Sequence, residues 1–455
     1  MNRKGDKLIP VLWGCSLGLM LLLLLSHTYN DILITARHGI NFWKLLFEGN
    51  ILHFFEMNYV ASGNDYYSMV QGCAYNILLY IIFAVWNIPL ALLEAFTNVD
   101  VMNNIFCIAY IKLLTVAAMA VSAGILQKIF GLLGIDREQH GLLLFLYMTS
   151  TLMVAIVFVI SQYDLISVVF QLLGIQAFLE KKDKKFILYF GVAFCLKYFS
   201  LILFLPLLLL RKKRILSWIP AMVGMLLPLA VTSLPFVNSY DRFSSELTGD
   251  LLSKLFNYDG RGYSLFVILY CFLLVWCFLQ NEDYSAPKVI WASFVAYGLF
   301  FSLLDGYLYW SIMFAPFMVL LIAIMPRYLY LNLLLETLCY AAVVMGHLIT
   351  YSVFFFGDTM KSMLMSHVVS QGALNYEGSL IYHIVGQLVR KNWIFPACNS
   401  VFIAAIAVMA FLGYPGSNPE EVGTFRLGQE CREMLVFRFL VTCGICMLPV
   451  LSLFI

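Results

Sequence analysis

The chain has 455 residues, of which 62% are hydrophobic and 12% are charged, whereas an average soluble protein has about 25% charged residues. Apolar runs of about 18 residues or more recur along most of the length, and each is long enough to cross a hydrocarbon core of about 30 Å. The formal net charge is +2, which provides no overall field to attract nucleic acid. The composition excludes a soluble protein and predicts one all-α, polytopic integral-membrane domain over residues 1–455.

The N-terminus is predicted to lie in the cytoplasm. Arg3, Lys4 and Lys7 precede the first apolar run, residues 8–26, with little acid to offset them, and positive residues favour the cytoplasmic side of a span. The run has no small-residue cleavage site, so we expect a retained membrane helix and not a removed signal peptide. Residues 28–73 then form a large first extracytoplasmic loop.

Two long extracytoplasmic loops are expected, residues 28–73 and residues 356–393. Within the first loop, the apolar and aromatic residues of segment 40–47 recur at helical spacing beside a polar face. This pattern is typical of a helix that lies in the plane of the membrane interface.

The remaining chain contributes further membrane segments, for a total of about 12 or 13. Asn87 and Pro89 interrupt the first of them. If residues 28–73 and residues 162–164 both lie on the outer side, one segment between residues 74 and 128 must be re-entrant. We expect that segment to be 74–96. The predicted segments are 74–96, 104–128, 141–160, 165–179, 186–210, 215–236, 263–280, 289–304, 311–325, 331–355, 394–413 and 435–454.

Two basic clusters, residues 181–185 and residues 211–214, carry the clearest signal about topology. Both should be cytoplasmic, yet a single span between them would place them on opposite sides. One resolution is that residues 186–210 bend into two half-helices that enter and leave from the cytoplasmic face, with Lys197 as the interior polar group and Pro206 as the breaker. A plain span is the alternative.

Three groups of polar residues would meet on the outer side under this topology. Asp31 follows the first span, and burial against apolar surface would raise its proton affinity and suit it to act as a general base. Its alternative role is a helix cap beside Asn30. The other two groups are Gln162, Tyr163 and Asp164, and Asp305 with Tyr307 and Trp310.

Asp164 and four further side chains are candidates for binding, and each has a structural alternative. Arg37 and His38 suit a phosphate, or they extend to lipid headgroups. Asp164 suits a sugar hydroxyl or a metal, or it caps the next helix. Lys197 lies in a membrane segment, where a charge usually faces a cavity or a partner such as a lipid phosphate, or it extends to the cytoplasmic face. Glu56 is the second candidate acid, or a solvated loop carboxylate.

Two other residue types have structural interpretations. Lys112 lies inside the apolar run 104–128 and invites the same interpretation as Lys197, with an internal ion pair as the alternative. The eleven cysteines lie mostly inside apolar runs, without zinc-like spacing, and we interpret them as small buried hydrophobic residues.

The order of these features resembles the integral-membrane glycosyltransferases of the C superfamily (GT-C), in particular the bacterial, mannosyltransferase-like branch. An acidic residue follows the first helix, and an interfacial aromatic helix comes next. Gln162-Tyr163-Asp164 then precedes a helix that ends in lysines, and the run from Gly191 to Ser200 continues through Pro206 into residues 211–214. The resemblance covers mainly residues 26–214.

The resemblance implies an inverting hexosyltransferase in the plasma membrane that moves a sugar from a polyprenyl-phosphate donor to an acceptor on the outer face. The acceptor would be a glycolipid, a cell-surface polymer or a protein. The family's essential acidic residue corresponds to Asp31. The leaving phosphate needs positive charge, which Arg37, His38, Lys197 or a divalent cation such as Mg²⁺ or Mn²⁺ would supply.

A transporter or flippase of lipid-linked saccharide is the alternative function. Such a protein would show internal repeats and discontinuous helices in matching positions of two halves, and the sequence shows no such symmetry. Membrane lipids are expected partners under either function.

Overall fold

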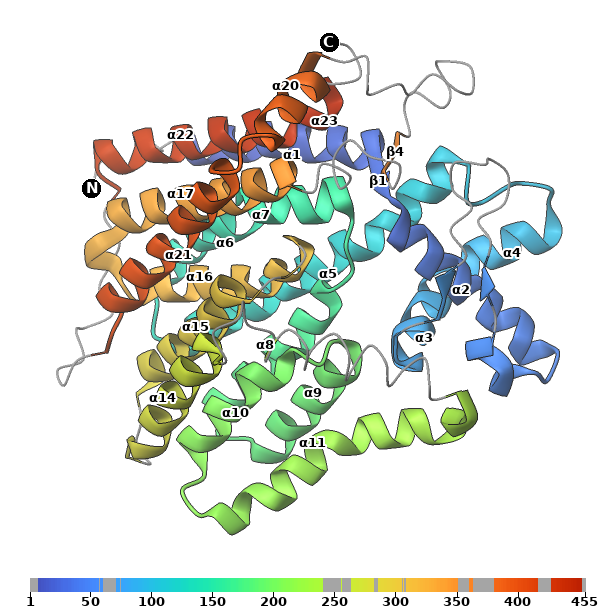
Figure 1. Cartoon of the computed structure of the whole chain (residues 1–455), viewed down its shortest axis with the longest axis horizontal. Helices are drawn as coiled ribbons and strands as arrows, with labels where there is room; N and C mark the ends of the chain where they lie inside the picture. The colour runs from blue at the N-terminus through green and yellow to red at the C-terminus, as the bar shows by residue number, and fades with distance from the viewer. Residues whose placement is uncertain are drawn as a thin grey trace.

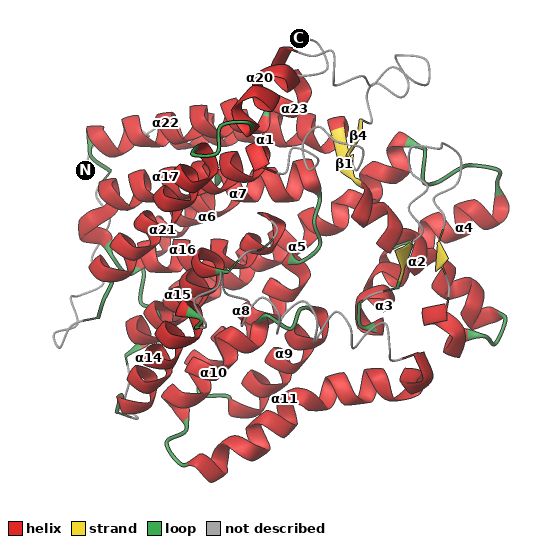
Figure 2. Cartoon of the chain, viewed as in Figure 1, coloured by secondary structure: helices red, strands yellow, loops and turns green. Residues whose placement is uncertain are grey.

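The protein is almost entirely helical, as the sequence predicts (Figure 2). A computed structural model describes residues 7–56, 58–59, 71–73, 75–239, 255, 263–281, 285–304, 306, 308–350, 360–362, 380–415 and 427–451. In Figure 1, helices from both ends of the chain lie together in one bundle, and α2, α3 and α4 form a separate group beside it.

The first half of the chain forms short and long helices with three short strands. In order they are α1 (Leu8–Ser26), β1 (His27–Tyr29), α2 (Asn30–Phe47), η1 (Ile51–Glu56), β2 (Asn58–Tyr59), β3 (Gln71–Gly72), α3 (Ile77–Trp86), α4 (Ile88–Phe96), α5 (Ile105–Leu132), α6 (Arg137–Met148), α7 (Thr151–Val154), η3 (Ala155–Ile160), α8 (Leu165–Leu179), α9 (Asp183–Leu196) and α10 (Ser200–Arg211).

The second half continues the helical pattern. Its elements are η4 (Ile215–Ser217), α11 (Trp218–Ser233), η5 (Leu234–Ser239), α14 (Leu265–Leu279), α15 (Ala286–Leu303), η7 (Leu308–Phe314), α16 (Ala315–Ala323), η8 (Pro326–Tyr328), α17 (Leu329–Thr350), β4 (Met360–Ser362), α20 (Leu380–Val389), α21 (Ile394–Leu412), α22 (Gln429–Cys446) and α23 (Leu448–Leu451).

Six helices of the described chain are long and apolar enough to cross a membrane, or up to eight if each of two bent helix pairs counts as one span. Four shorter apolar helices accompany them: α8, α10, α14 and the pair η7–α16. The lengths therefore support several membrane spans, but fewer full-length spans than the 12 or 13 membrane segments that the sequence predicts.

The segment after α1 differs from the predicted loop. Chain 28–73 begins with the short strand β1, and Asp31 then lies in the first turn of α2, which continues to Phe47. The predicted interfacial helix 40–47 is therefore the second half of a longer helix. A carboxylate in the first turn is favoured by the helix dipole, and Asp31 takes that position in place of a loop.

The two predicted outer loops meet at a short sheet. Strand β1 pairs antiparallel with β4, so that Thr28 lies opposite Lys361. The pairing joins the start of the first long loop to part of segment 356–393 and places the two on the same side of the molecule.

Helix α2 packs tightly against α3. A Cβ atom at Gly39 would lie 2.8 Å from the Cβ atom of Phe83, so only glycine fits this close approach, and the indole of Trp43 donates a hydrogen bond to the Ala84 carbonyl (2.8 Å). Helices α3 and α4 meet at 63° with Asn87 between them. The predicted break in segment 74–96 is confirmed.

Helices α9 and α10 form a hairpin, as the bent alternative predicts. Their 14 and 12 residues span about 21 and 18 Å at about 1.5 Å per residue, too little for each to cross about 30 Å of hydrocarbon. Asp183, at the start of α9, binds Arg211 (2.8 Å) and Lys212 (2.7 Å) at the end of α10. The two basic clusters therefore lie together, and Lys197 lies at the turn.

The electrostatics of Asp183 agree with this closure. Partial burial by itself would raise the pKa of Asp183, but the hydrogen bonds and charges of Lys212 and Arg211 lower the pKa overall. The carboxylate therefore stays ionised and holds the two ends of the hairpin together.

The hairpin predicts that both basic clusters label from one side of the membrane. In a background without the exposed cysteines Cys15 and Cys271, we expect Lys184→Cys and Arg214→Cys to react with a membrane-impermeant maleimide from the cytoplasmic side. Both positions are exposed. Lys44→Cys, at an exposed lysine of α2, should react from the opposite side. Labelling of the first two variants from opposite sides would establish a plain span.

The predicted helix 141–160 is wrong as a single helix, because the chain bends by 52° between α6 and α7. The Thr149 hydroxyl donates a hydrogen bond to the carbonyl of Phe145 (2.6 Å) at the end of α6. Ser150 then accepts a hydrogen bond from the Met153 amide (3.2 Å) and caps α7. The turn before Ser161 is a π-helix, η3.

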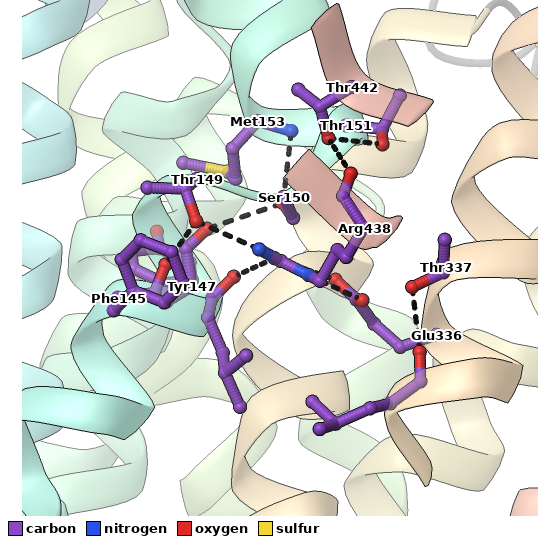
Figure 3. A network of polar contacts seen from close by, with 12 residues as sticks. Phe145, Tyr147, Thr149, Ser150, Thr151, Met153, Glu336, Thr337, Arg438 and Thr442 are labelled. Atoms are coloured by element: carbon purple, nitrogen blue, oxygen red, sulfur yellow. Dashed lines mark hydrogen bonds and ion pairs between the residues drawn. The ribbon is translucent and has the colours of Figure 1, made fainter. Parts of the chain in front are cut away.

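A buried ion pair stabilises this bend (Figure 3). Arg438 on α22 is 1% exposed and binds both carboxylate oxygens of Glu336 on α17, at 2.8 and 3.0 Å. It also donates to the Thr149 hydroxyl (2.8 Å) and to the Leu146 carbonyl. One guanidinium therefore joins α22, α17 and the end of α6.

Candidate functional site

The site centres on Asp31, which receives two hydrogen bonds from the turn between η3 and α8. Gln162 Nε2 lies 3.0 Å and the Tyr163 hydroxyl 3.1 Å from Asp31 Oδ2. Thr35, one turn further along α2, donates to the Tyr163 hydroxyl (3.1 Å). The Gln162 side chain is itself fixed, because its Oε1 accepts from the Tyr163 amide (3.0 Å). Gln162 and Tyr163 are fully buried, whereas Asp31 is only partly buried, so Asp31 is the accessible member.

Ser161 gives this turn its shape. The residue has a φ of 61°, in the left-handed region, which a non-glycine residue adopts only at a cost. The preceding π-helix and this one residue together turn the chain so that Gln162 and Tyr163 face α2. π-Helical turns often occur at functional sites.

Replacing Ser161 by glycine is expected to stabilise the protein by about 1 kcal/mol, because glycine adopts φ > 0 without strain. Thermal unfolding of the purified protein measures this change. Ser161→Ala is the matched control, since it removes the same buried hydroxyl but keeps the strained backbone. A lower unfolding temperature for the glycine variant than for the alanine variant would contradict the expectation.

A buried ion pair lies next to the Asp31 group. Lys197 Nζ, at the turn of the hairpin, is 3.2 Å from Asp164 Oδ1, and the two side chains are 5% and 2% exposed. Aromatic rings of Tyr75 and Trp310 lie 5.3 Å from the ammonium group, within the range of cation–π attraction. The ring of Tyr75 also contacts Tyr163 edge to face. The cation is thus shielded from water and adjacent to the residues that hold Asp31.

The depth of this pair follows from helix lengths. Helix α8 has 15 residues, which is about 22 Å at about 1.5 Å per residue. It runs alongside α9, where Ser167 donates to the Ala193 carbonyl (3.0 Å). Asp164 and Lys197 therefore lie about 22 Å along the helices from the basic clusters, which is less than the thickness of a hydrocarbon core of about 30 Å. If the basic clusters lie at one headgroup level, this distance places the pair inside the core, recessed below the opposite surface.

Burial controls the acidity of Asp31. Removal from water raises its pKa above the usual value, and the hydrogen bonds from Gln162 and Tyr163 and the charge of Lys197 oppose the rise without cancelling it. A carboxylate with a raised pKa is a better proton acceptor than a solvated one, which is the property that a general base needs.

Lys112 connects the two segments that build the site. Its fully buried ammonium group donates to the carbonyls of Leu23 (3.3 Å) and Leu24 (2.7 Å) at the end of α1, and to the Phe158 carbonyl (3.0 Å) in η3. One segment leads to Asp31 and the other to Gln162. Its charge was visible in the sequence, and the partners that these contacts give it are backbone carbonyls.

The other predicted site residues have different surroundings. Arg37 binds the carboxylate of Glu94 on α4 (2.6 and 2.5 Å). The guanidinium group that was expected to bind phosphate therefore has a carboxylate partner within the protein. His38 is buried against the rings of Phe54 and Tyr80.

One predicted acid, Glu56, is not brought to this group. Glu56 is exposed and pairs with His53 (2.9 Å), which fits its solvated alternative. Asp305 and Tyr307 lie outside the described residues. Of the third predicted polar group, the structure therefore describes only Trp310, which lies beside Lys197.

Sequence reasoning missed Thr35 and Tyr75. Neither carries a charge, and each acts through the hydroxyl or ring of Tyr163. The helical spacing of Thr35 from Asp31 is the one signal that could have identified it.

Within the part of the chain that the structure describes, no three His, Cys, Asp or Glu side chains lie close enough together to hold a metal ion. The groups that contact Asp31 and Asp164 are the Gln162 amide, the Tyr163 phenol and the Lys197 ammonium group. These are hydrogen-bond donors, which pair with a carboxylate and do not coordinate a metal cation. The expected Mg²⁺ or Mn²⁺ does not fit these residues, and no step below is assigned to a metal.

Comparison of the chain with protein-family models, with curated proteins and with solved structures finds no match. The functional proposal therefore depends on the residues of the site.

Proposed function

We propose that the protein is a membrane-embedded glycosyltransferase that moves a sugar from a polyprenyl-phosphate donor to an acceptor hydroxyl. The observation that supports this most directly is the partly buried residue Asp31, whose carboxylate is held by Gln162 and Tyr163 beside the buried pair of Lys197 and Asp164. This arrangement supplies a proton acceptor and a nearby cation, which are the two groups that displacement of a phosphate requires.

The proposed reaction is a single displacement with inversion. Asp31 accepts the proton of the acceptor hydroxyl while that oxygen forms a bond to the anomeric carbon. The bond between this carbon and the phosphate oxygen breaks, and the phosphate leaves with the electron pair. Negative charge develops on the phosphate in the transition state, and the ammonium group of Lys197 stabilises it electrostatically in a region of low dielectric.

The recessed position of the site supports a lipid-linked substrate. A sugar carried on a polyprenyl phosphate has its phosphate next to the acyl region, so that it approaches a recessed ammonium group from within the membrane. A soluble nucleotide sugar would have to leave water with several charges, at a high cost in solvation free energy. We therefore expect discrimination in favour of lipid-phosphate donors.

The test is a transfer assay with the full-length protein in lipid nanodiscs. A panel of polyprenyl-phosphate sugars and the corresponding nucleotide sugars is offered with a mixed set of acceptor lipids, and transfer is measured by mass spectrometry. We expect transfer from at least one lipid-phosphate sugar and none from the nucleotide sugars. Failure of every lipid-phosphate sugar would overturn the proposal.

A paired variant separates function from folding. Asp164→Asn with Lys197→Met removes both charges together and leaves no unpaired buried ion. We expect its unfolding temperature to stay near that of the wild type while transfer falls by about 10²-fold or more, the usual effect of losing a transition-state donor. Lys128→Met, at an exposed lysine of α5, is the control.

A transporter of lipid-linked saccharide remains the second candidate, because the structure contains helices that are discontinuous within apolar segments. The pairs α3–α4 and α6–α7 bend by 63° and 52°, and α9–α10 is a hairpin. Transporters use such breaks at their substrate sites. Movement of an intact lipid-phosphate sugar between leaflets of proteoliposomes, without cleavage of the sugar–phosphate bond, would favour this function.

A further inference from the structure

The base of the α9–α10 hairpin carries an unusual concentration of positive charge. Residues 181–185 and 211–214 contain eight lysine and arginine side chains, and the carboxylates among or next to them are Glu180 and Asp183. The net charge of this region is therefore +6, in a chain whose overall formal charge is +2. We call these two runs the basic patch. They are 25 residues apart in the sequence and come together only through the hairpin.

The two carboxylates use up part of this charge. Asp183 binds Arg211 and Lys212, and Glu180 binds Lys182 at 2.6 Å. Asp183 is therefore a bridge that fixes the spacing of the two runs. The charge that remains on the patch is positive, because two acids cannot balance eight bases.

Other cations of the patch face the surroundings. Lys181, Lys184, Lys185 and Arg214 are exposed, and they come from both runs. They form a surface that can approach an anion from several directions, with the charge-assisted hydrogen bonds that phosphate oxygens accept.

An apolar surface continues directly from the patch. Ile215 and Leu216 follow Arg214 and are 65% and 81% exposed. Trp218, which is typical of the membrane interface, donates its indole N–H to the Lys212 carbonyl (2.8 Å). Only about a tenth of the span that begins at Ile215 is buried inside the protein. Cations beside exposed aliphatic side chains match a molecule with an anionic head and an apolar tail.

We propose that the basic patch, with the adjoining start of α11, is a binding site for anionic phospholipids on the cytoplasmic face. The phosphate group would contact the exposed cations, and the acyl chains would lie along Ile215 and Leu216. Inorganic phosphate has the same anionic group as a phospholipid but no acyl chain. The apolar surface therefore favours binding of a phospholipid over inorganic phosphate. Polybasic segments next to a membrane helix attract anionic lipids in this way.

The experiment measures lipid binding to the full-length protein. The protein in zwitterionic phosphatidylcholine nanodiscs or mixed micelles is titrated with phosphatidylglycerol, with additional phosphatidylcholine, or with inorganic phosphate. Bound lipid is counted by native mass spectrometry, and the unfolding temperature is followed in parallel. We expect phosphatidylglycerol to bind about tenfold or more tightly than phosphatidylcholine, and inorganic phosphate at the same concentration to compete weakly.

Variants then locate the site. Lys184→Gln, Lys185→Gln and Arg214→Gln combined should abolish the preference for phosphatidylglycerol. The control combines Lys44→Gln with neutralisation of two other exposed cations, Arg390→Gln and Lys391→Gln, and should keep the preference with the same loss of charge. Since all six positions are exposed, both combinations should unfold near the wild-type temperature.

Each outcome decides for or against the lipid site. Loss of the preference in the first combination alone supports it. An equal preference in both combinations, or none in the wild type, overturns it. Equal binding of inorganic phosphate and phosphatidylglycerol would show a site for soluble anions instead. No glycosyl transfer is measured, so the result is independent of the proposed enzymatic function.

Discussion

Replacing Asp31 by asparagine is expected to lower the rate of sugar transfer by about 10²- to 10⁴-fold, the usual contribution of a general base. Asparagine keeps the size of the side chain and can still contact Gln162 and Tyr163, but it cannot accept the proton of the acceptor hydroxyl. The measurement is the initial rate of transfer by purified protein in nanodiscs at saturating donor.

Two readouts accompany this variant. The wild-type rate should rise with pH through the raised pKa of Asp31, because only the ionised carboxylate acts as a base, and the variant should lack this acidic limb. Glu56→Gln, at the exposed acid paired with His53, is the control and should keep nearly full activity. A fully active Asp31→Asn protein would remove Asp31 as the base, and an inactive Glu56→Gln protein would transfer the role to Glu56.

The same variant has a defined effect on stability. Burial raises the folded-state pKa of Asp31 above its unfolded value. The folded state therefore binds this proton more tightly, and stability from this group is lost as the pH rises from the unfolded pKa through the folded pKa. Above the folded-state pKa, the wild type bears the cost of a charge that is partly removed from water. We expect Asp31→Asn to unfold at the same or a higher temperature, which separates loss of activity from misfolding.

Replacing Arg438 by methionine is expected to destabilise the protein by about 3–5 kcal/mol, the typical cost of leaving one member of a buried ion pair without its partner. Glu336 is 3% exposed, so neither water nor lipid headgroups can solvate its charge. The variant also frees the Thr149 hydroxyl and the Leu146 carbonyl at the end of α6. Thermal unfolding of the purified protein should show a decrease of several degrees.

A double variant tests the mechanism of this loss. Arg438→Met with Glu336→Met removes both charges and should recover most of the stability, because an apolar pair can replace a buried ion pair at little net cost. Arg390→Met, at an exposed arginine, is the control and should change stability little. Additive losses in the double variant, or a single-variant loss below about 1 kcal/mol, would contradict the ion-pair mechanism.

Much of the fold follows from local sequence signals. The helix 165–179 was predicted, and the hairpin within residues 186–210 was one of two predicted alternatives, because hydropathy and basic clusters act over short stretches of sequence. The break at Asn87 was also predicted, because Asn-x-Pro marks it. The bend at Thr149 and Ser150 was not, because neither residue is a strong helix breaker and an apolar run hides the change of direction.

The candidate site could be predicted only in part. Asp31, Tyr163 and Lys197 were identified because a carboxylate after a span, a Gln-Tyr-Asp run and a lysine in an apolar segment are rare in a chain that is 62% hydrophobic. The pairing of Arg37 with Glu94 was not predicted, since the two residues are 57 positions apart in the sequence and no local pattern connects them.

The sequence alone determined that this is a multi-span helical membrane protein and that Asp31 follows the first helix, but it left two arrangements open for the basic clusters. Only the tertiary structure decided that Gln162 and Tyr163 bind Asp31, that Lys112 joins α1 to η3, and that Arg438 pairs with Glu336 across 102 residues. Hydropathy and charge are local quantities, whereas partners are chosen by packing. In a membrane helix the lipid-facing and protein-facing sides are both apolar, so the pattern of hydrophobic residues does not reveal which faces meet.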